Sequence, residues 1–179
     1  MSPLKCCAEI EDDNDVGSGA LKMRKSFQLK DYMRSIESIC DDWLRHSGAT
    51  GRGLSPQTSR NGEFLRAVYA LVLSYRDCGK LEIIKKVVEK DGNAPARGPT
   101  FEENPFHWAL LSVFSEQGDG PDRRERSLFA YQMLYADRHK VPPHLLIGFI
   151  YQCGKQTPIS QRLKQGEIEP GFSDVVERG

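Results

Sequence analysis

Residues 27–44, FQLKDYMRSIESICDDWL, carry the clearest structural pattern in the chain. Their apolar side chains recur at steps of three and four residues, which places them on one stripe of an α-helix. The stripe consists of Leu29, Tyr32, Met33, Ile36, Ile39, Cys40, Trp43 and Leu44. Ser26 suits the N-cap and Gly48 a left-handed stop. We therefore expect a helix whose Tyr32 and Trp43 rings anchor a core.

A second amphipathic pattern runs from Phe64 to Cys78, with Asn61 as its expected N-cap and Gly79 as its stop. The intervening residues 47–62 contain four glycines and a proline. They lack both the preceding strand and the Gly-Lys-Ser/Thr ending of a phosphate-binding loop. We expect a long surface loop here, and loops of such length are typically functional or disordered.

Residues 80–153 fit two structures. The β-branched content of residues 81–88 and the alternation in residues 129–135 would suit strands, whereas spacings of four residues suit helices. Asn104-Pro105 indicates a capped helix start. The fold class we expect is mainly α, a helix-rich single domain with a long Gly-rich loop. The alternative is α+β, with strands in residues 80–153.

Composition along the chain suggests three regions. Residues 1–20 form an expected disordered acidic tail, because they hold few large apolar side chains. Residues 21–154 form the expected globular domain, with a lobe boundary, if one exists, at residues 91–104. Residues 155–179 are polar and punctuated by proline and glycine, which predicts a loose tail.

The cysteines and apolar runs bear on the compartment. No apolar run approaches the roughly 20 residues of a membrane span. The N-terminus has no apolar signal-peptide core. Five scattered cysteines, of which Cys40 and Cys78 lie on apolar helical faces, are typical of core thiols in a reducing compartment. We expect a cytoplasmic protein.

Catalytic and metal-binding patterns were sought among the cysteines and histidines. His139 and His144 are spaced too widely for a short zinc loop, and no closely spaced cysteine pair accompanies them. His107 beside Trp108 suits a partly buried structural histidine. An enzyme would need a cleft that joins a histidine to Cys78, Cys153 or an acid pair. We expect no enzyme, no cofactor and no metal.

The zero net charge is unevenly distributed. Residues 1–20 have net charge −4, residues 21–100 have +6, and residues 101–179 have −2. The acidic tail either shields the basic half of the chain, or the basic half presents a surface that attracts anions. The basic residues expected to contact a partner are Lys22, Arg24, Lys25, Lys30, Arg34, Arg52, Arg60, Lys85 and Lys86.

Residues 21–79 resemble the central part of rhabdovirus matrix proteins. The matching residues are Lys22-Met-Arg24, Phe27-Gln-Leu29, Asp31-Tyr32, Trp43, Gly48, and Phe64-Leu65 to Leu73-Ser74. The chain departs from that family in its acidic N-terminus and in the His144-Leu145 that follows Pro142-Pro143. No functional residue is carried over. The resemblance implies a viral structural protein that self-associates and bridges nucleocapsid and membrane.

Two functions follow as hypotheses. The first is a non-enzymatic assembly or adaptor protein that binds a protein partner or itself, and in its matrix-like form an anionic membrane surface. The second is an intracellular nucleic-acid-binding regulator that uses the bases of residues 22–34 and 80–90. Strands in residues 100–154 would favour the matrix-like form, and helices a bundle-like adaptor or regulator.

Overall fold

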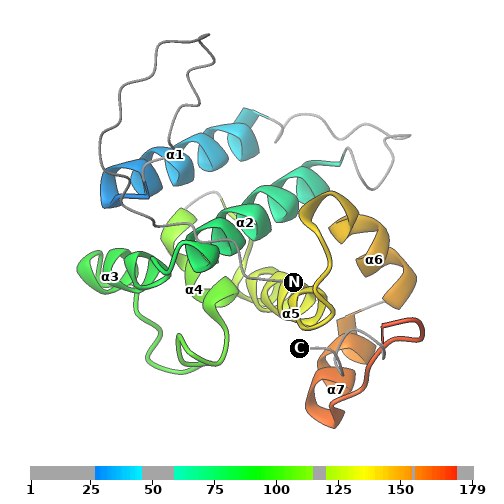
Figure 1. The fold of residues 1–179 in the computed structure, drawn as a ribbon. Coiled ribbons are helices and arrows are strands. Elements are labelled where there is room, and N and C mark those ends of the chain that lie inside the picture. The colour runs from blue at the N-terminus through cyan, green and yellow to red at the C-terminus, as the bar shows by residue number, and fades with distance from the viewer. Residues whose placement is uncertain (1–26, 46–58, 115–119, 155, 173–179) are drawn as a thin grey trace, which may run out of the picture.

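The computed structural model describes residues 27–45, 59–114, 120–154 and 156–172 (Figure 1). Within these ranges the chain forms seven α-helices, one short 3-10 helix and no strand. The elements are α1 (Leu29–Arg45), α2 (Arg60–Asp77), α3 (Glu82–Lys90), α4 (Pro105–Val113), α5 (Arg123–Arg138), η2 (Pro143–Leu145), α6 (Leu146–Cys153) and α7 (Gln156–Gln165). The mainly α fold class is confirmed.

Helices α1, α4, α5 and α6 pack against α2, whereas α3 packs on α4 and α7 on α5. Helix α2 runs through the middle of Figure 1. There α1 lies above α2, α3 lies beyond its end on the left, and α4 and α5 lie below it. The second half of the chain adds α6 and α7 on the right-hand side. No described helix is long and apolar enough to cross a membrane.

The centre of the α1 stripe is buried as the sequence predicts, whereas Leu29 and Leu44 at its two ends are exposed. Tyr32 is fully buried and Trp43 is 3 % exposed, so both rings are core anchors. The Tyr32 hydroxyl lies 2.6 Å from the Ser112 hydroxyl of α4, which satisfies the one polar atom of this ring. The Trp43 ring packs edge-on against Phe64 and Phe114. Ser26 and Gly48, the expected cap and stop of this helix, lie outside the described residues.

The start of α2 corrects the sequence analysis. Ser59 is the N-cap, and its hydroxyl accepts a hydrogen bond from the Gly62 backbone N–H at 3.1 Å. Asn61 therefore lies inside the helix, and the expected loop of residues 47–62 ends by Ser59; residues 47–58 are not described. Serine caps a helix as well as asparagine does, so composition alone did not choose between them. The predicted stop at Gly79 is confirmed, with φ +64°.

The alternative of strands in residues 80–153 is wrong for the described residues. Ile84, Val87 and Val88 are at most 2 % exposed and share one face of α3, so burial outweighs their β propensity. Asp122 and Glu125 form a reciprocal capping box that starts α5. This helix contains residues 129–135, whose alternating pattern also suited a strand.

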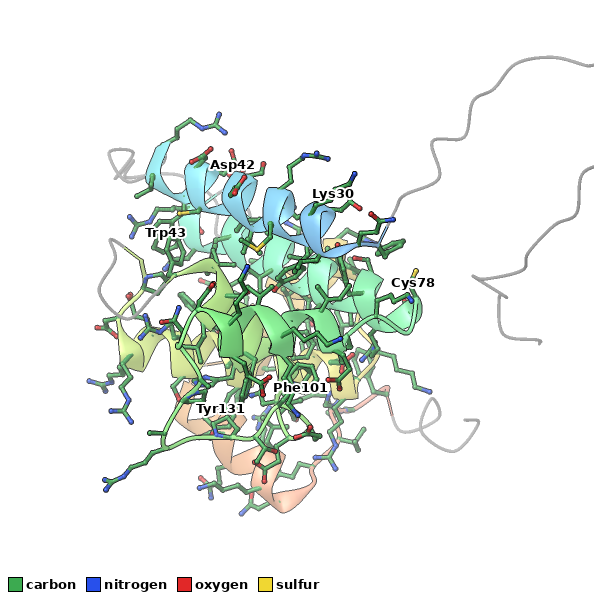
Figure 2. The ribbon with its side chains drawn as sticks, turned by 90° about the vertical axis from the view of Figure 1, so that its left-hand side faces the viewer. Lys30, Asp42, Trp43, Cys78, Phe101 and Tyr131 are labelled. Carbon is green, nitrogen blue, oxygen red and sulfur yellow. The ribbon has the colours of Figure 1, made fainter. Side chains whose placement is uncertain are left out.

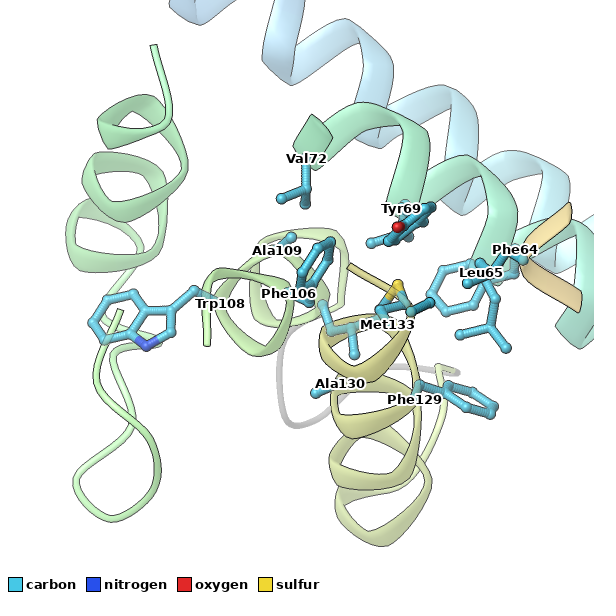
Figure 3. Packing of buried hydrophobic residues seen from close by; sticks show 14 of the residues in the cluster. Phe64, Leu65, Tyr69, Val72, Phe106, Trp108, Ala109, Phe129, Ala130 and Met133 are labelled. Atoms are coloured by element: carbon cyan, nitrogen blue, oxygen red, sulfur yellow. The ribbon is translucent and has the colours of Figure 1, made fainter. Parts of the chain in front are cut away.

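One hydrophobic core includes residues from both sides of the suggested lobe boundary at residues 91–104. Figure 3 shows its centre, where Tyr69 of α2, Phe106 of α4 and Met133 of α5 meet. The Tyr69 and Phe106 rings stack with their centroids 5.4 Å apart. The Tyr69 hydroxyl donates to the Val141 carbonyl at 2.8 Å. Helices α2, α4 and α5 thus share a single core.

The expected loose tail at residues 155–179 is wrong over residues 156–172. These residues form α7 and a segment that returns to α5. Ile159 of α7 is 1 % exposed and belongs to the core. The mean composition of the segment is polar, but Ile159, the partly buried Leu163 and Phe172, and a set of charged contacts dock it. Residues 173–179 are not described.

Candidate anion-binding groove

The basic residues expected to bind a partner do not gather at one place. Lys22, Arg24, Lys25 and Arg52 lie outside the described residues. Lys30 belongs to the first turn of α1, whereas Arg60 stacks over the Trp43 ring near the last turn, 4.1 Å from its centroid. That separation is about 20 Å along the helix. Figure 2 shows Lys30 and Trp43 at the two ends of α1.

Two of the remaining expected residues are ion-paired. Arg34 lies 3.6 Å from Asp31, and the Lys85 ammonium donates to Glu102 at 3.1 Å. Lys86 is exposed on α3 between Glu82 and Glu89. Acidic neighbours therefore offset much of the positive charge that the sequence suggested for α3.

A different set of basic side chains lines an open groove of about 760 Å³ between the 92–99 segment and helices α4 and α5. We call this cavity the basic groove. Its cationic lining residues are Arg97, Arg123 and Arg126, and no lining residue is acidic. The other lining side chains include His107, Leu111, Ser127, Tyr131 and the prolines Pro95 and Pro99.

The N-caps of α4 and α5 fix where each helix begins, and thereby which of its residues face the groove. The Asn104 side chain caps α4 by accepting from the His107 backbone N–H at 3.2 Å. His107 and Leu111 are one turn apart and both line the groove. In α5 the capping box at Asp122 places Arg123 and Arg126 in the first turns. The same face continues through Ser127 and Tyr131, at steps of three or four residues.

The loop wall is held at its base. The Trp108 indole Nε1–H donates to the Pro99 carbonyl at 3.1 Å, and the Trp108 ring packs edge-on against Phe101. Figure 3 shows the Trp108 ring apart from the central core residues, on the side of α3. Phe101 and Tyr131 mark this part of the molecule in Figure 2.

Gly98 lies where the loop wall of the groove meets His107 of α4. Its backbone φ of +147° is a conformation that residues with a Cβ rarely adopt. A Cβ at this position would lie 3.7 Å from the His107 Nε2. That distance is an ordinary packing contact, so the positive φ, and not a lack of space, favours glycine here.

Arg126 is the most unusual charge in the groove. It is only 5 % exposed, and its Nη1 donates to the Pro121 carbonyl at 3.2 Å. No ion pair joins Arg126, Arg123 or Arg97 to a carboxylate among the described residues. A buried charge without a counter-ion costs several kcal/mol. An anion in the groove would remove that cost.

The pKa of His107 reflects the positive charge of the neighbouring arginines. Burial lowers the pKa of His107 below its ordinary value of 6.5, and the charges on Arg126 and Arg123 lower it further. The imidazole is therefore neutral at pH 7 and can donate one hydrogen bond to a ligand. His107 is half-buried, as the sequence suggested, but it also forms part of the groove wall.

Sequence reasoning missed the groove because its three arginines come from two distant segments. The signal in the sequence is the run Asp122-Arg-Arg-Glu-Arg126, which by itself indicates a helix start and no binding site. In a helix, Arg123 and Arg126 share a face, whereas Arg124 does not. The folded chain adds Arg97 to them.

The remaining histidines, cysteines and acidic residues of the described ranges form no evident metal-binding or nucleophilic site. The described residues contain no group of three or more histidine, cysteine or acidic side chains that could hold a metal ion. Burial raises the pKa of Cys153 to about 12, with a further contribution from Glu169, so its thiol is protonated at neutral pH. The Cys40 and Cys78 side chains are half-buried.

The sequence matches no known protein-family model, and neither curated proteins nor solved structures provide a significant match.

Proposed function

We propose that this protein is a non-enzymatic interaction protein that holds an acidic segment of a protein partner in the basic groove. One observation supports this most directly: the groove presents the buried Arg126 together with Arg97 and Arg123, and its lining contains no acid. Guanidinium groups bind carboxylates through paired hydrogen bonds, which are about twice as strong as neutral ones. The cytoplasmic location belongs to the proposal, because scattered cysteines are typical of a reducing compartment.

Dimensions and lining favour a short polypeptide over a nucleic acid. A cavity of about 760 Å³ accommodates a few residues, and Leu111, Tyr131 and the prolines provide apolar walls for their side chains. The helices found in residues 105–153 support a bundle-like adaptor over the matrix-like form. Self-association and a viral role stay predictions.

The test is the affinity of the full-length protein for a fluorescein-labelled hexaglutamate peptide, measured by fluorescence anisotropy at about 0.1 M salt. Arg123→Gln should weaken binding about tenfold or more, because it removes a charge-assisted hydrogen bond. Arg124→Gln is the matched control. It removes the same charge from the neighbouring position, which does not line the groove, and should change the affinity less than about twofold.

Two outcomes would overturn the proposal. Equal losses in Arg123→Gln and Arg124→Gln, or no peptide binding by any form, would show that the groove does not recognise carboxylates. Tighter binding to a single-stranded oligonucleotide, weakened by Lys85→Gln and Lys86→Gln, would instead support the nucleic-acid hypothesis.

A further inference from the structure

The densest run of acidic residues in this chain lies near its own N-terminus. Residues 9–15, EIEDDND, contain five carboxylates and no basic residue. They belong to the first 20 residues, whose net charge is −4. The basic groove is lined by three arginines and by no acidic residue. The chain therefore contains both members of a complementary pair.

We propose that residues 9–15 of the same chain occupy the basic groove and compete there with an external acidic partner. This inference rests on the proposed function of the groove and identifies residues 9–15 as the segment that binds there when no external partner is present. Carboxylates of the segment pair with Arg123 and Arg126, and Ile10 between them contacts the apolar wall that includes Leu111 and Tyr131.

Chain length permits this contact within one molecule. Eleven residues separate Asp15 from Phe27, the first described residue. Fully extended, eleven residues span at most about 40 Å. Phe27 packs against Tyr75 near the end of α2, and α3, which is about 14 Å long, is the element that separates α2 from the 92–99 wall of the groove. A linker of this length can therefore span from Phe27 to the groove.

Tethering favours the segment of the same chain over that of a second copy. A segment whose linker spans the distance meets its site at an effective concentration in the millimolar range. At micromolar protein concentration a second molecule competes poorly, unless its affinity is far higher. A segment that binds with a Kd of about 0.1–0.5 mM would therefore weaken an external ligand about threefold to tenfold.

The experiment compares three full-length proteins by hexaglutamate anisotropy: the wild type, an N-terminal triple variant and a control triple variant. The N-terminal variant carries Glu11→Gln, Asp12→Asn and Asp13→Asn. The control carries Glu37→Gln, Glu82→Gln and Glu89→Gln, which remove three exposed carboxylates from α1 and α3. The two variants have equal net charge, so a difference between them reports position and not total charge.

We expect the N-terminal variant to bind hexaglutamate about threefold to tenfold more tightly than the control. In ¹H–¹⁵N spectra, the amides of Arg123 and Tyr131 should shift in the N-terminal variant, whereas those of α7 should not. Both results together would support the inference.

Three results would overturn it, and they separate it from the proposed function. Equal affinities of the two variants, with normal peptide binding, would reject the occupant and leave the groove function standing. No binding by any protein would reject both. A dimer in light scattering that the N-terminal variant abolishes would assign the segment to a second copy instead.

Discussion

The two ends of α5 carry charged side chains in opposite circumstances. At its start, Arg123 and Arg126 line the basic groove without a carboxylate partner among the described residues. Near its end, charged groups are paired. The Tyr135 hydroxyl donates to Glu169 at 2.7 Å, and Arg162 of α7 binds the same carboxylate oxygen. Residues Tyr135, His139, Cys153, Arg162 and Glu169 are called the Glu169 cluster below.

His139 extends the Glu169 cluster to the backbone. Its Nε2 accepts from the Glu169 backbone N–H at 2.9 Å, so the ring proton lies on Nδ1. That Nδ1 donates to the Tyr135 carbonyl at 2.7 Å. The His139 side chain is 2 % exposed, and both of its nitrogens are satisfied. This end of α5 therefore resembles a completed structural network, whereas the arginines at the other end have no carboxylate partner among the described residues.

The difference teaches how to distinguish binding residues from structural ones on a single helix. In a completed network, removal of one charge should reduce stability. In an incomplete one, it should reduce ligand affinity and leave stability unchanged or higher. Free energies of unfolding measured by urea denaturation can test this contrast.

The largest effect on stability is expected from Ile159→Ala in α7. Because Ile159 is 1 % exposed, the change should lower the free energy of unfolding by about 2–4 kcal/mol. Gln161→Ala, an exposed position of the same helix, should change it by less than about 0.5 kcal/mol. If the two variants were equally stable, α7 would not belong to the cooperative core, and the Glu169 cluster would not be structural.

A smaller loss is expected from Glu169→Gln. Burial raises the pKa of Glu169, but hydrogen bonds from Tyr135 and Arg162 outweigh it, so the pKa lies below its ordinary 4.5. The folded state therefore binds its proton less readily than the unfolded state, and the stabilisation is present above about pH 4.5. At pH 7 the variant should lose about 1–2 kcal/mol.

Acid titration provides the control for Glu169→Gln. As the pH falls through the lowered pKa, the wild type should lose the contribution of this carboxylate and approach the variant. Urea midpoints of both proteins at pH 7, 4 and 3 would measure the convergence. A gap that stayed constant at all three pH values would show that the charge of Glu169 does not stabilise the fold.

The smallest effect on stability is expected from Arg126→Met. Methionine keeps the apolar stem and removes an uncompensated buried charge. The free energy of unfolding should stay within about 0.5 kcal/mol of the wild type or rise by about 1 kcal/mol. A loss above about 1 kcal/mol would make Arg126 a structural residue, and the contrast between the two ends of α5 would fail.

Local chemistry explains which elements could be predicted from the sequence. The helix of α1 with its buried Tyr32 and Trp43, the Asn104 cap and the Gly79 stop depend on neighbours within one or two turns, and the structure confirms them. The segment at residues 82–90 could not be assigned in this way. Its β-branched residues become helical because one face is buried against the core.

The groove could not be predicted because its charges meet only after folding. Arg97 is separated from Arg123 by more than a helix, and nothing local marks them as neighbours. Conversely, basic residues that are close in sequence proved to be dispersed or paired, as Lys85 is with Glu102. Lys22, Arg24, Lys25 and Arg52 lie outside the described residues, so their partner-binding role stays a prediction.

The sequence by itself determined the helical character, the rings that anchor the core and the uneven distribution of charge, because periodicity and composition are local properties. The tertiary structure alone decided which charges acquire partners. Pairing depends on distances of a few ångströms between segments far apart in the chain, and desolvation makes a paired charge differ in its energetic cost from an unpaired one. That distinction makes Glu169 a structural residue and Arg126 the centre of the proposed binding site.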